Sequence, residues 1–194
     1  TFGDTARLRI LEAHRRADRS RYFQSVAKIP GNINGHVIRI MKEMFNEVLF
    51  EEVRERRAWA YAINSSRHNF RHFYEFSINC GALALKAIDD IEEVIEVCVA
   101  SMTDREDLFE QAKRRALASN FMTDPTGKGI CNGALNDLAE DQRIISLAEI
   151  GNDLKQVTMN NVRNSLQWLR PGRRWTAAGP CRPAGTGPES GRRA

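Results

Sequence analysis

An arginine and a tyrosine seven residues apart have the clearest capacity for chemistry in this sequence. Arg54 and Tyr61 lie in the stretch FNEVLFEEVRERRAWAYAINSS, which runs from Phe45 to Ser66. A guanidinium or a phenol aimed at a carbonyl oxygen stabilises the negative charge that develops there during peptide hydrolysis. A guanidinium also holds a carbonyl or carboxylate group with well-defined geometry. The alternative is structural: Arg54 pairs with Glu51 on its own helix, and Tyr61 is an ordinary strand aromatic.

The spacing of apolar residues predicts the elements that hold this pair. Apolar residues recur at helical spacing from Val37 to Val53, after Asn32 or Asn34, either of which can cap the helix. Glu52 and Arg56 are four residues apart and can pair on its solvated face. After this helix the pattern changes abruptly to the alternation of a strand.

The alternation predicts a hairpin with one buried and one wetter face. Its first strand begins at Trp59, a polar turn spans residues 65–69, and its second strand covers residues 70–80. A further strand is predicted from Tyr22 to Ile29, and the chain after Gly81 has mostly helical patterns. Strands and helices are therefore segregated, which predicts an α+β fold in which several helices pack on one face of an antiparallel sheet.

Composition divides the chain of 194 residues into a body and a tail. Residues 171–194 hold five arginines and one glutamate, which equals the whole net charge of +4. They are also rich in proline and glycine, which predicts disorder apart from a short edge strand at residues 174–178. We therefore expect one domain over residues 1–170 and a disordered tail over residues 171–194. The start at Thr1 rather than at Met suggests a fragment or a processed product.

The neutral body argues against several classes of protein. A nucleic-acid-binding domain needs a basic face on its folded part, and residues 1–170 have no excess of basic side chains to supply one. The basic tail alone leaves a weaker possibility of contact with RNA or acidic lipids. No apolar run is long enough to predict a membrane span. We expect a soluble protein, cytoplasmic or periplasmic if it is bacterial, and the sequence does not decide its compartment.

Two further groups of polar residues have plausible chemistry but favour structural interpretations. His68 and His72 are four residues apart, a spacing that binds zinc on a helix. On a strand this spacing separates them by about 13 Å, too far to share one ion, and no glutamate lies between them. The carboxylates between Asp89 and Glu96 could do acid–base chemistry but more simply form the solvated side of a helix. We expect no metal site in this chain.

The segment VRERRAWAYAI, residues 53–63, resembles a known family. It is similar to the segment that reads roughly LREKRGLAYSV in the pitrilysin/insulinase family of zinc metallopeptidases, which includes the mitochondrial processing peptidases. The segments LFEQAKRRAL and VTMNNVRNSLQWLRP follow in the order of that family's C-terminal subdomain. The resemblance covers about residues 20–170 and implies a metallopeptidase subdomain of the processing-peptidase type.

This resemblance implies a division of labour between domains. Members of the family enclose a chamber built from repeated α+β subdomains, and an N-terminal subdomain holds zinc through an inverted His-x-x-Glu-His motif. The opposite half lacks zinc, and in many members it contributes an arginine and a tyrosine that contact the substrate peptide. Arg54 and Tyr61 match that pair. The chain is then expected to close the chamber and bind peptide, with zinc held by another domain or subunit and no activity alone.

The sequence departs from the family pattern at two places. Residues 46–49 replace a glycine-rich turn, and Ala58-Trp59 replaces Gly-Leu. Two alternatives to the peptidase domain remain open. One is a non-catalytic structural member of the same family, like the core proteins of a respiratory complex. The other is a binding module that uses the basic tail.

Overall fold

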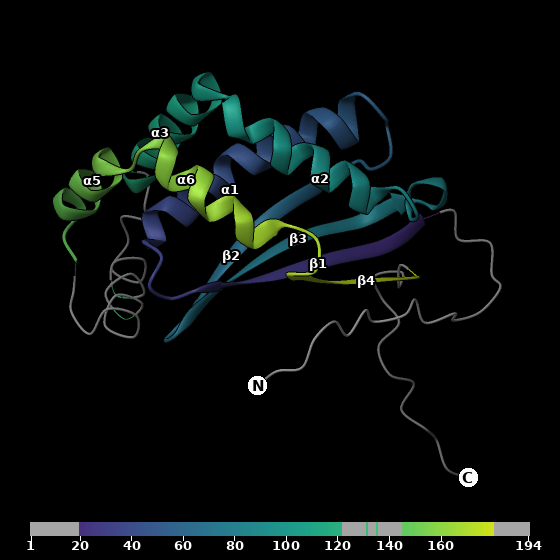
Figure 1. The fold of residues 1–194 in the computed structure, drawn as a ribbon, viewed down its shortest axis with the longest axis horizontal. Helices are drawn as coiled ribbons and strands as arrows, with labels where there is room; N and C mark the ends of the chain where they lie inside the picture. The colour runs from purple at the N-terminus through teal and green to yellow at the C-terminus, as the bar shows by residue number, and fades with distance from the viewer. Residues whose placement is uncertain (1–19, 122–130, 132–134, 136–144, 181–194) are drawn as a thin grey trace, which may run out of the picture.

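A four-stranded antiparallel sheet with helices on one face makes up the fold of this computed structural model (Figure 1). The structure describes residues 20–121, 131, 135 and 145–180. The strands are β1 (Ser20–Pro30), β2 (Ile63–Phe70), β3 (Phe73–Ala84) and β4 (Arg174–Pro180), and their order in the sheet is β2-β3-β1-β4. The predicted α+β class is confirmed.

The helices pack on the side of the sheet that carries its apolar side chains. They are α1 (Gly35–Leu49), α2 (Ile91–Ser101), α3 (Glu106–Phe121), α5 (Leu147–Gln156) and α6 (Met159–Leu166). Three short 3-10 helices lie directly after β3, α2 and α6, at Leu85–Ala87, Met102–Asp104 and Gln167–Leu169. The helix α1 crosses the sheet, and its apolar residues recur at spacings of three and four because that repeat keeps them on one face. The side chain of Asn34 accepts a hydrogen bond from the His36 backbone at 2.8 Å, which confirms one of the two predicted caps.

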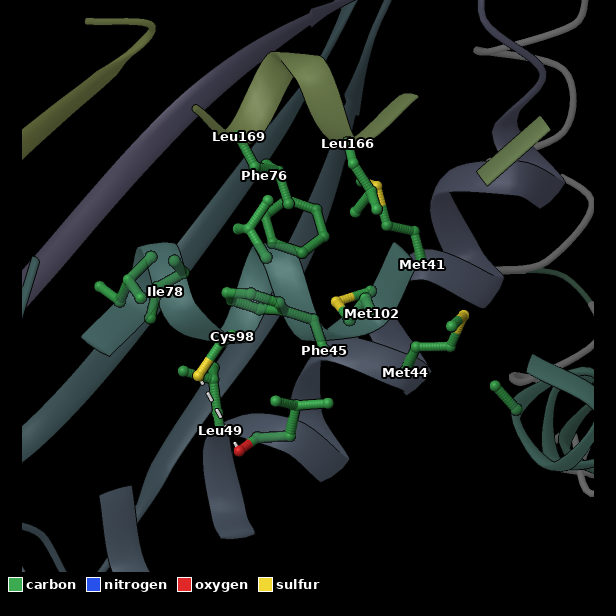
Figure 2. Packing of buried hydrophobic residues seen from close by; sticks show 14 of the residues in the cluster. Met41, Met44, Phe45, Leu49, Phe76, Ile78, Cys98, Met102, Leu166 and Leu169 are labelled. Carbon is green, nitrogen blue, oxygen red and sulfur yellow. Dashed lines mark hydrogen bonds between the residues drawn. The ribbon is translucent and has the colours of Figure 1, made fainter. Parts of the chain in front are cut away.

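The core lies between α1, α2 and the sheet. Phe45 of α1 meets Phe76 of β3 edge to face, with ring centres 5.8 Å apart (Figure 2). The thiol of Cys98 on α2 lies among these residues, 3.9 Å from the Val48 carbonyl oxygen. The buried side chains form one continuous cluster, which agrees with a single core for the described part of the chain.

The hairpin confirms the buried face of its second strand and corrects the predicted bounds of both strands and of the turn. Phe76, Ile78 and Cys80 of β3 are buried, as their alternation predicts. The first strand, however, begins at Ile63 rather than at Trp59, and residues 65–69 belong to β2 instead of forming a turn. The turn lies at residues 71–72, and the second strand covers Phe73–Ala84 rather than residues 70–80. Pairing with β3 and contacts to α1 outweigh the weak strand propensity of this polar segment.

The strand β4 extends the fold beyond residue 170. The short edge strand predicted at residues 174–178 is present and continues to Pro180, paired with β1. The Arg174 side chain is only 3% exposed, and its Nη2 donates to Glu92 of α2 at 2.7 Å and also to Glu96. Burial raises the pKa of the Glu96 carboxyl, against the opposing attraction of Arg174. These carboxylates, predicted to be merely solvated, therefore fasten β4 to α2.

We expect Arg174→Ala to lower the free energy of unfolding by about 1–3 kcal/mol, because it strips a buried partner from two carboxylates. Arg174→Met should lower the free energy of unfolding by less, because it keeps the packing of the side-chain stem. Urea unfolding followed by circular dichroism measures both changes, and Arg173→Ala at the exposed preceding position is the control. Equal stability of Arg174→Ala and the unmodified chain would contradict this role for β4.

Burial also predicts the reactivity of the cysteines. It raises the pKa of the Cys98 thiol to about 12, so almost no thiolate exists near neutral pH. In a Cys131→Ser/Cys181→Ser variant, a thiol reagent should therefore modify neither Cys80 nor Cys98 until denaturant unfolds the chain. The extent of modification is measured from the absorbance of the chromophore that the thiol reagent releases. Rapid reaction under native conditions would show that this part of the core opens.

Candidate functional site

A wide helical turn ends α1 and carries the candidate arginine. After Leu49 the chain continues through a π-helical segment, Phe50–Glu55. Such segments are rare and are frequent at functional sites. Glu52 points inward from this segment and is only 7% exposed. A buried carboxylate needs partners, so the residues around Glu52 determine how the segment is held.

Two consecutive arginines satisfy the Glu52 carboxylate. Arg56 donates to Oε1 at 2.5 Å, which confirms the predicted pair but not its placement on a solvated face. Arg57 donates to Oε2 and, at 2.8 Å, to the Glu52 backbone carbonyl. Arg56 also bonds Glu51 at 2.6 Å. The carboxylate thus ties the residues just after the π-helical segment back onto it.

A left-handed residue then reverses the chain. Ala58 has a φ of 52°, a conformation that costs a residue with a Cβ about 1–2 kcal/mol. Its backbone N–H donates to the Arg54 carbonyl at 3.1 Å, and that of Trp59 donates to the Val53 carbonyl at 3.0 Å. These bonds close the end of the helix in the manner of a left-handed C-cap. Ala58 stands where the resembling family segment has glycine.

The chain after the reversal is fastened to β3 before β2 begins. Ala84 donates its backbone N–H to the Trp59 carbonyl at 2.8 Å, and Ala60 forms an isolated bridge with Leu83. Tyr61 follows in a bend, so the prediction that it lies on a strand is wrong. Because Ala60 and Ile63 are buried, Tyr61 between them is left on the surface, 80% exposed.

The reversal brings the two candidate side chains together. The guanidinium carbon of Arg54 lies 4.9 Å from the centre of the Tyr61 ring and 4.7 Å from that of Phe50. A guanidinium over two aromatic faces is held by cation–π attraction. We call Phe50, Arg54 and Tyr61 the aromatic–arginine cluster. Sequence reasoning did not find Phe50, although its position four residues before Arg54 places both on one face of a helix.

The aromatic–arginine cluster has hydrogen-bonding capacity to spare. Glu51, the structural partner considered for Arg54, instead contacts Arg56 and Arg105. Within the described ranges, no carboxylate lies within ion-pair distance of Arg54 and no group hydrogen-bonds to the Tyr61 hydroxyl. Aromatic contacts occupy faces of the guanidinium, so its N–H groups remain able to donate in its plane. An extended peptide, with a carbonyl at every residue, is a suitable acceptor.

Asn46 gives the helix a second attachment to the hairpin. Its side-chain oxygen accepts from the Ser65 backbone N–H at 2.6 Å and from the Ser65 hydroxyl at 2.9 Å. The helix α1 is therefore fixed to β2 by a side chain that the glycine-rich turn of the resembling family cannot supply. Trp59, at the second departure, is half-buried against the core.

The residues described here do not form a zinc site. His68 lies on β2, and His72 lies in the turn that follows it. Across the described ranges, no three His, Cys, Asp or Glu side chains are grouped so that they could hold a metal ion. In the same part of the chain, no helix is both long and apolar enough to cross a membrane.

Comparison with known proteins identifies relatives of this fold. Residues 35–116 match the family model described as the peptidase M16 inactive domain. No curated protein matches the sequence. The segment matched by the family model includes α1, the π-helical segment, the hairpin and most of α3, and therefore contains the whole aromatic–arginine cluster.

Several solved structures share this fold. The peptidase M16 inactive domain from Pseudomonas fluorescens superposes with a TM-score of 0.67 at 15% identity, over 83% of this chain and 41% of that chain. The periplasmic protease PqqL from Escherichia coli gives 0.64 at 15% identity, over 86% of this chain and 20% of that chain. A chain of Complex III2 from Candida albicans gives 0.71 at 10% identity, over 86% and 44%. This chain thus spans less than half of each of these structures.

The strained backbone at Ala58 leads to a prediction about stability. Ala58→Gly should raise the free energy of unfolding by up to about 1 kcal/mol, because glycine adopts positive φ without steric cost. The matched control is Ala62→Gly, at an exposed position with negative φ, which should lower stability by roughly 0.5–1 kcal/mol. Thermal unfolding of the two variants measures the difference. A loss of stability in Ala58→Gly would contradict the left-handed conformation.

Proposed function

We propose that this chain is the non-zinc domain of an insulinase-like zinc metalloendopeptidase, because residues 35–116 match the family model described as the peptidase M16 inactive domain. It closes the peptidase chamber and binds the substrate peptide in an extended form. In this proposal the zinc belongs to another domain or subunit, as the family resemblance implies. The chain alone is inactive.

The observation that carries this proposal is the aromatic–arginine cluster. Arg54 and Tyr61, the pair that the family resemblance singles out, are in contact, and both are exposed. The Arg54 guanidinium donates to a substrate carbonyl or carboxylate, and the Tyr61 phenol donates to a second oxygen close by. Such donors act most strongly on an oxygen that gains negative charge as the peptide bond is attacked. A zinc ion held by that other domain or subunit would activate the attacking water, and Arg54 and Tyr61 would position the peptide and stabilise the developing charge.

A second function is favoured by one specific similarity. The Complex III2 chain from Candida albicans has the highest TM-score of the structures named above, and that assembly is not described as a peptidase. This chain could therefore serve the assembly of a complex without taking part in cleavage. The two functions differ in what the complete protein contains: a His-x-x-Glu-His segment in the same or an associated chain favours the peptidase.

We predict that substitutions in the cluster impair cleavage by the complete enzyme. With the zinc-bearing half present, Arg54→Ala and Tyr61→Phe should each lower kcat/KM for a peptide by about 10–100-fold, because each removes a donor to an oxygen that becomes charged. A fluorogenic peptide assay measures this loss.

Matched controls separate a site effect from a general one. Arg71→Ala removes an exposed arginine from the β2–β3 turn, and Tyr22→Phe removes an exposed phenol from β1. Both should leave kcat/KM unchanged. Unchanged cleavage in Arg54→Ala and Tyr61→Phe would refute the role of the pair. Zinc-dependent cleavage by this chain alone would refute the larger assignment.

A further inference from the structure

A basic groove lies between α1 and β2. It has a volume of about 310 Å³ and is lined by Arg39, Lys42, Ser65, Ser66 and Arg67. Three of these lining side chains are cationic, and none of the described residues that line the groove is acidic. This concentration of positive charge stands out in a chain whose first 170 residues are neutral overall.

Contacts within the fold hold Arg67 at the groove. Its Nη1 donates to the Gly35 backbone carbonyl at 2.9 Å, and its guanidinium carbon lies 5.8 Å from the centre of the Tyr74 ring. In the described part of the chain, no carboxylate lies within ion-pair distance of Arg67. The guanidinium is therefore positioned by neutral groups and keeps further N–H donors for another partner.

Arg39 brings a second guanidinium close to the first. It donates through Nη2 to the Ser119 hydroxyl of α3 at 2.8 Å, a bond that fixes it beside the groove. Burial, and secondly the nearby charge of Arg67, lower the pKa of Arg39, although Glu43 opposes this effect. Lys42 pairs with Glu43 at 2.8 Å. Two like charges held close together repel, and an anion between them offsets that repulsion.

The groove has room for a ligand larger than a single water molecule. Its volume of about 310 Å³ is enough for one small anion or one acidic side chain. Its wall on the β2 side is rigid at Ser65, because Asn46 of α1 bonds both the backbone N–H and the hydroxyl of that residue. The cationic groups are thus presented from two elements that are fixed to each other.

We propose that the groove between α1 and β2 binds a small oxyanion, a carboxylate or phosphate group, through Arg39, Lys42 and Arg67. Arginine supplies paired N–H donors that match the oxygens of either group, and lysine adds a compact charge. The site is separate from the aromatic–arginine cluster, with which it shares no residue.

Titration calorimetry on the whole chain tests the proposal, with sodium phosphate and sodium acetate as probes at matched ionic strength against sodium chloride. Saturable binding of phosphate alone assigns the groove to phosphate groups, and binding of acetate alone assigns it to carboxylates. Arg67→Gln and Lys42→Gln should each weaken the binding by about tenfold. Lys42→Gln leaves the contacts of Arg67 to Gly35 and Tyr74 in place, so it tests the site even if Arg67→Gln is unstable.

Arg71→Gln, in the exposed turn after β2, is the control for the loss of a single positive charge. It should bind the anion as the unmodified chain does. The proposal would be overturned if phosphate and acetate gave heats of binding no larger than those of chloride. It would also be overturned if Arg71→Gln weakened anion binding as much as Lys42→Gln does. The measurement needs no zinc-bearing partner, so it is independent of the proposed peptidase function.

Discussion

The arrangement of the site depends on one buried carboxylate. Glu52 faces inward from the π-helical segment at the end of α1, and Arg56 and Arg57 both donate to it. Because a largely buried carboxylate needs such partners, this interaction holds the chain that leaves the helix against the helix itself. The reversal at Ala58 follows directly, and Tyr61 is carried back to Arg54 as a result. The aromatic–arginine cluster is thus a consequence of how the helix ends. The strain at Ala58 persists because hydrogen bonds on both sides of it fix the backbone.

Much of the fold could be predicted from local patterns. The apolar repeat of α1, the cap at Asn34 and the buried alternation of β3 are encoded in short stretches of sequence, where periodicity decides which face is buried. The polar strand β2 could not be predicted in this way. Its residues 65–69 have the composition of a turn, and they form a strand because β3 and Asn46 supply partners from elsewhere in the chain. The strand β4 was predicted as a short edge strand, but its attachment to Glu92 and Glu96 of α2 could not be predicted, because these residues lie far from it in the sequence.

The candidate site was predictable in its residues but not in its geometry. The spacing of Arg54 and Tyr61, with the resemblance that it supports, identified the pair. A strand beginning at Trp59 would have placed Tyr61 in a ladder, whereas the left-handed turn at Ala58 places it on the surface. Phe50 entered the cluster only through the structure, because one exposed phenylalanine in a helical pattern has no distinctive signal. The basic groove brings together residues of α1 and β2. A net charge counted along the sequence does not show this local concentration of positive charge.

The central claim, that the aromatic–arginine cluster contacts the substrate peptide, is tested most directly by photo-crosslinking. A benzophenone amino acid replaces Tyr61 in the chain assembled with its zinc-bearing half, and a labelled peptide is added under conditions that block cleavage. The control carries the same amino acid at Phe70, an exposed aromatic residue at the far end of β2. The account predicts that the peptide crosslinks at position 61 and that unlabelled peptide competes, with little crosslinking at position 70. Equal crosslinking at the two positions, or none at position 61, would contradict it.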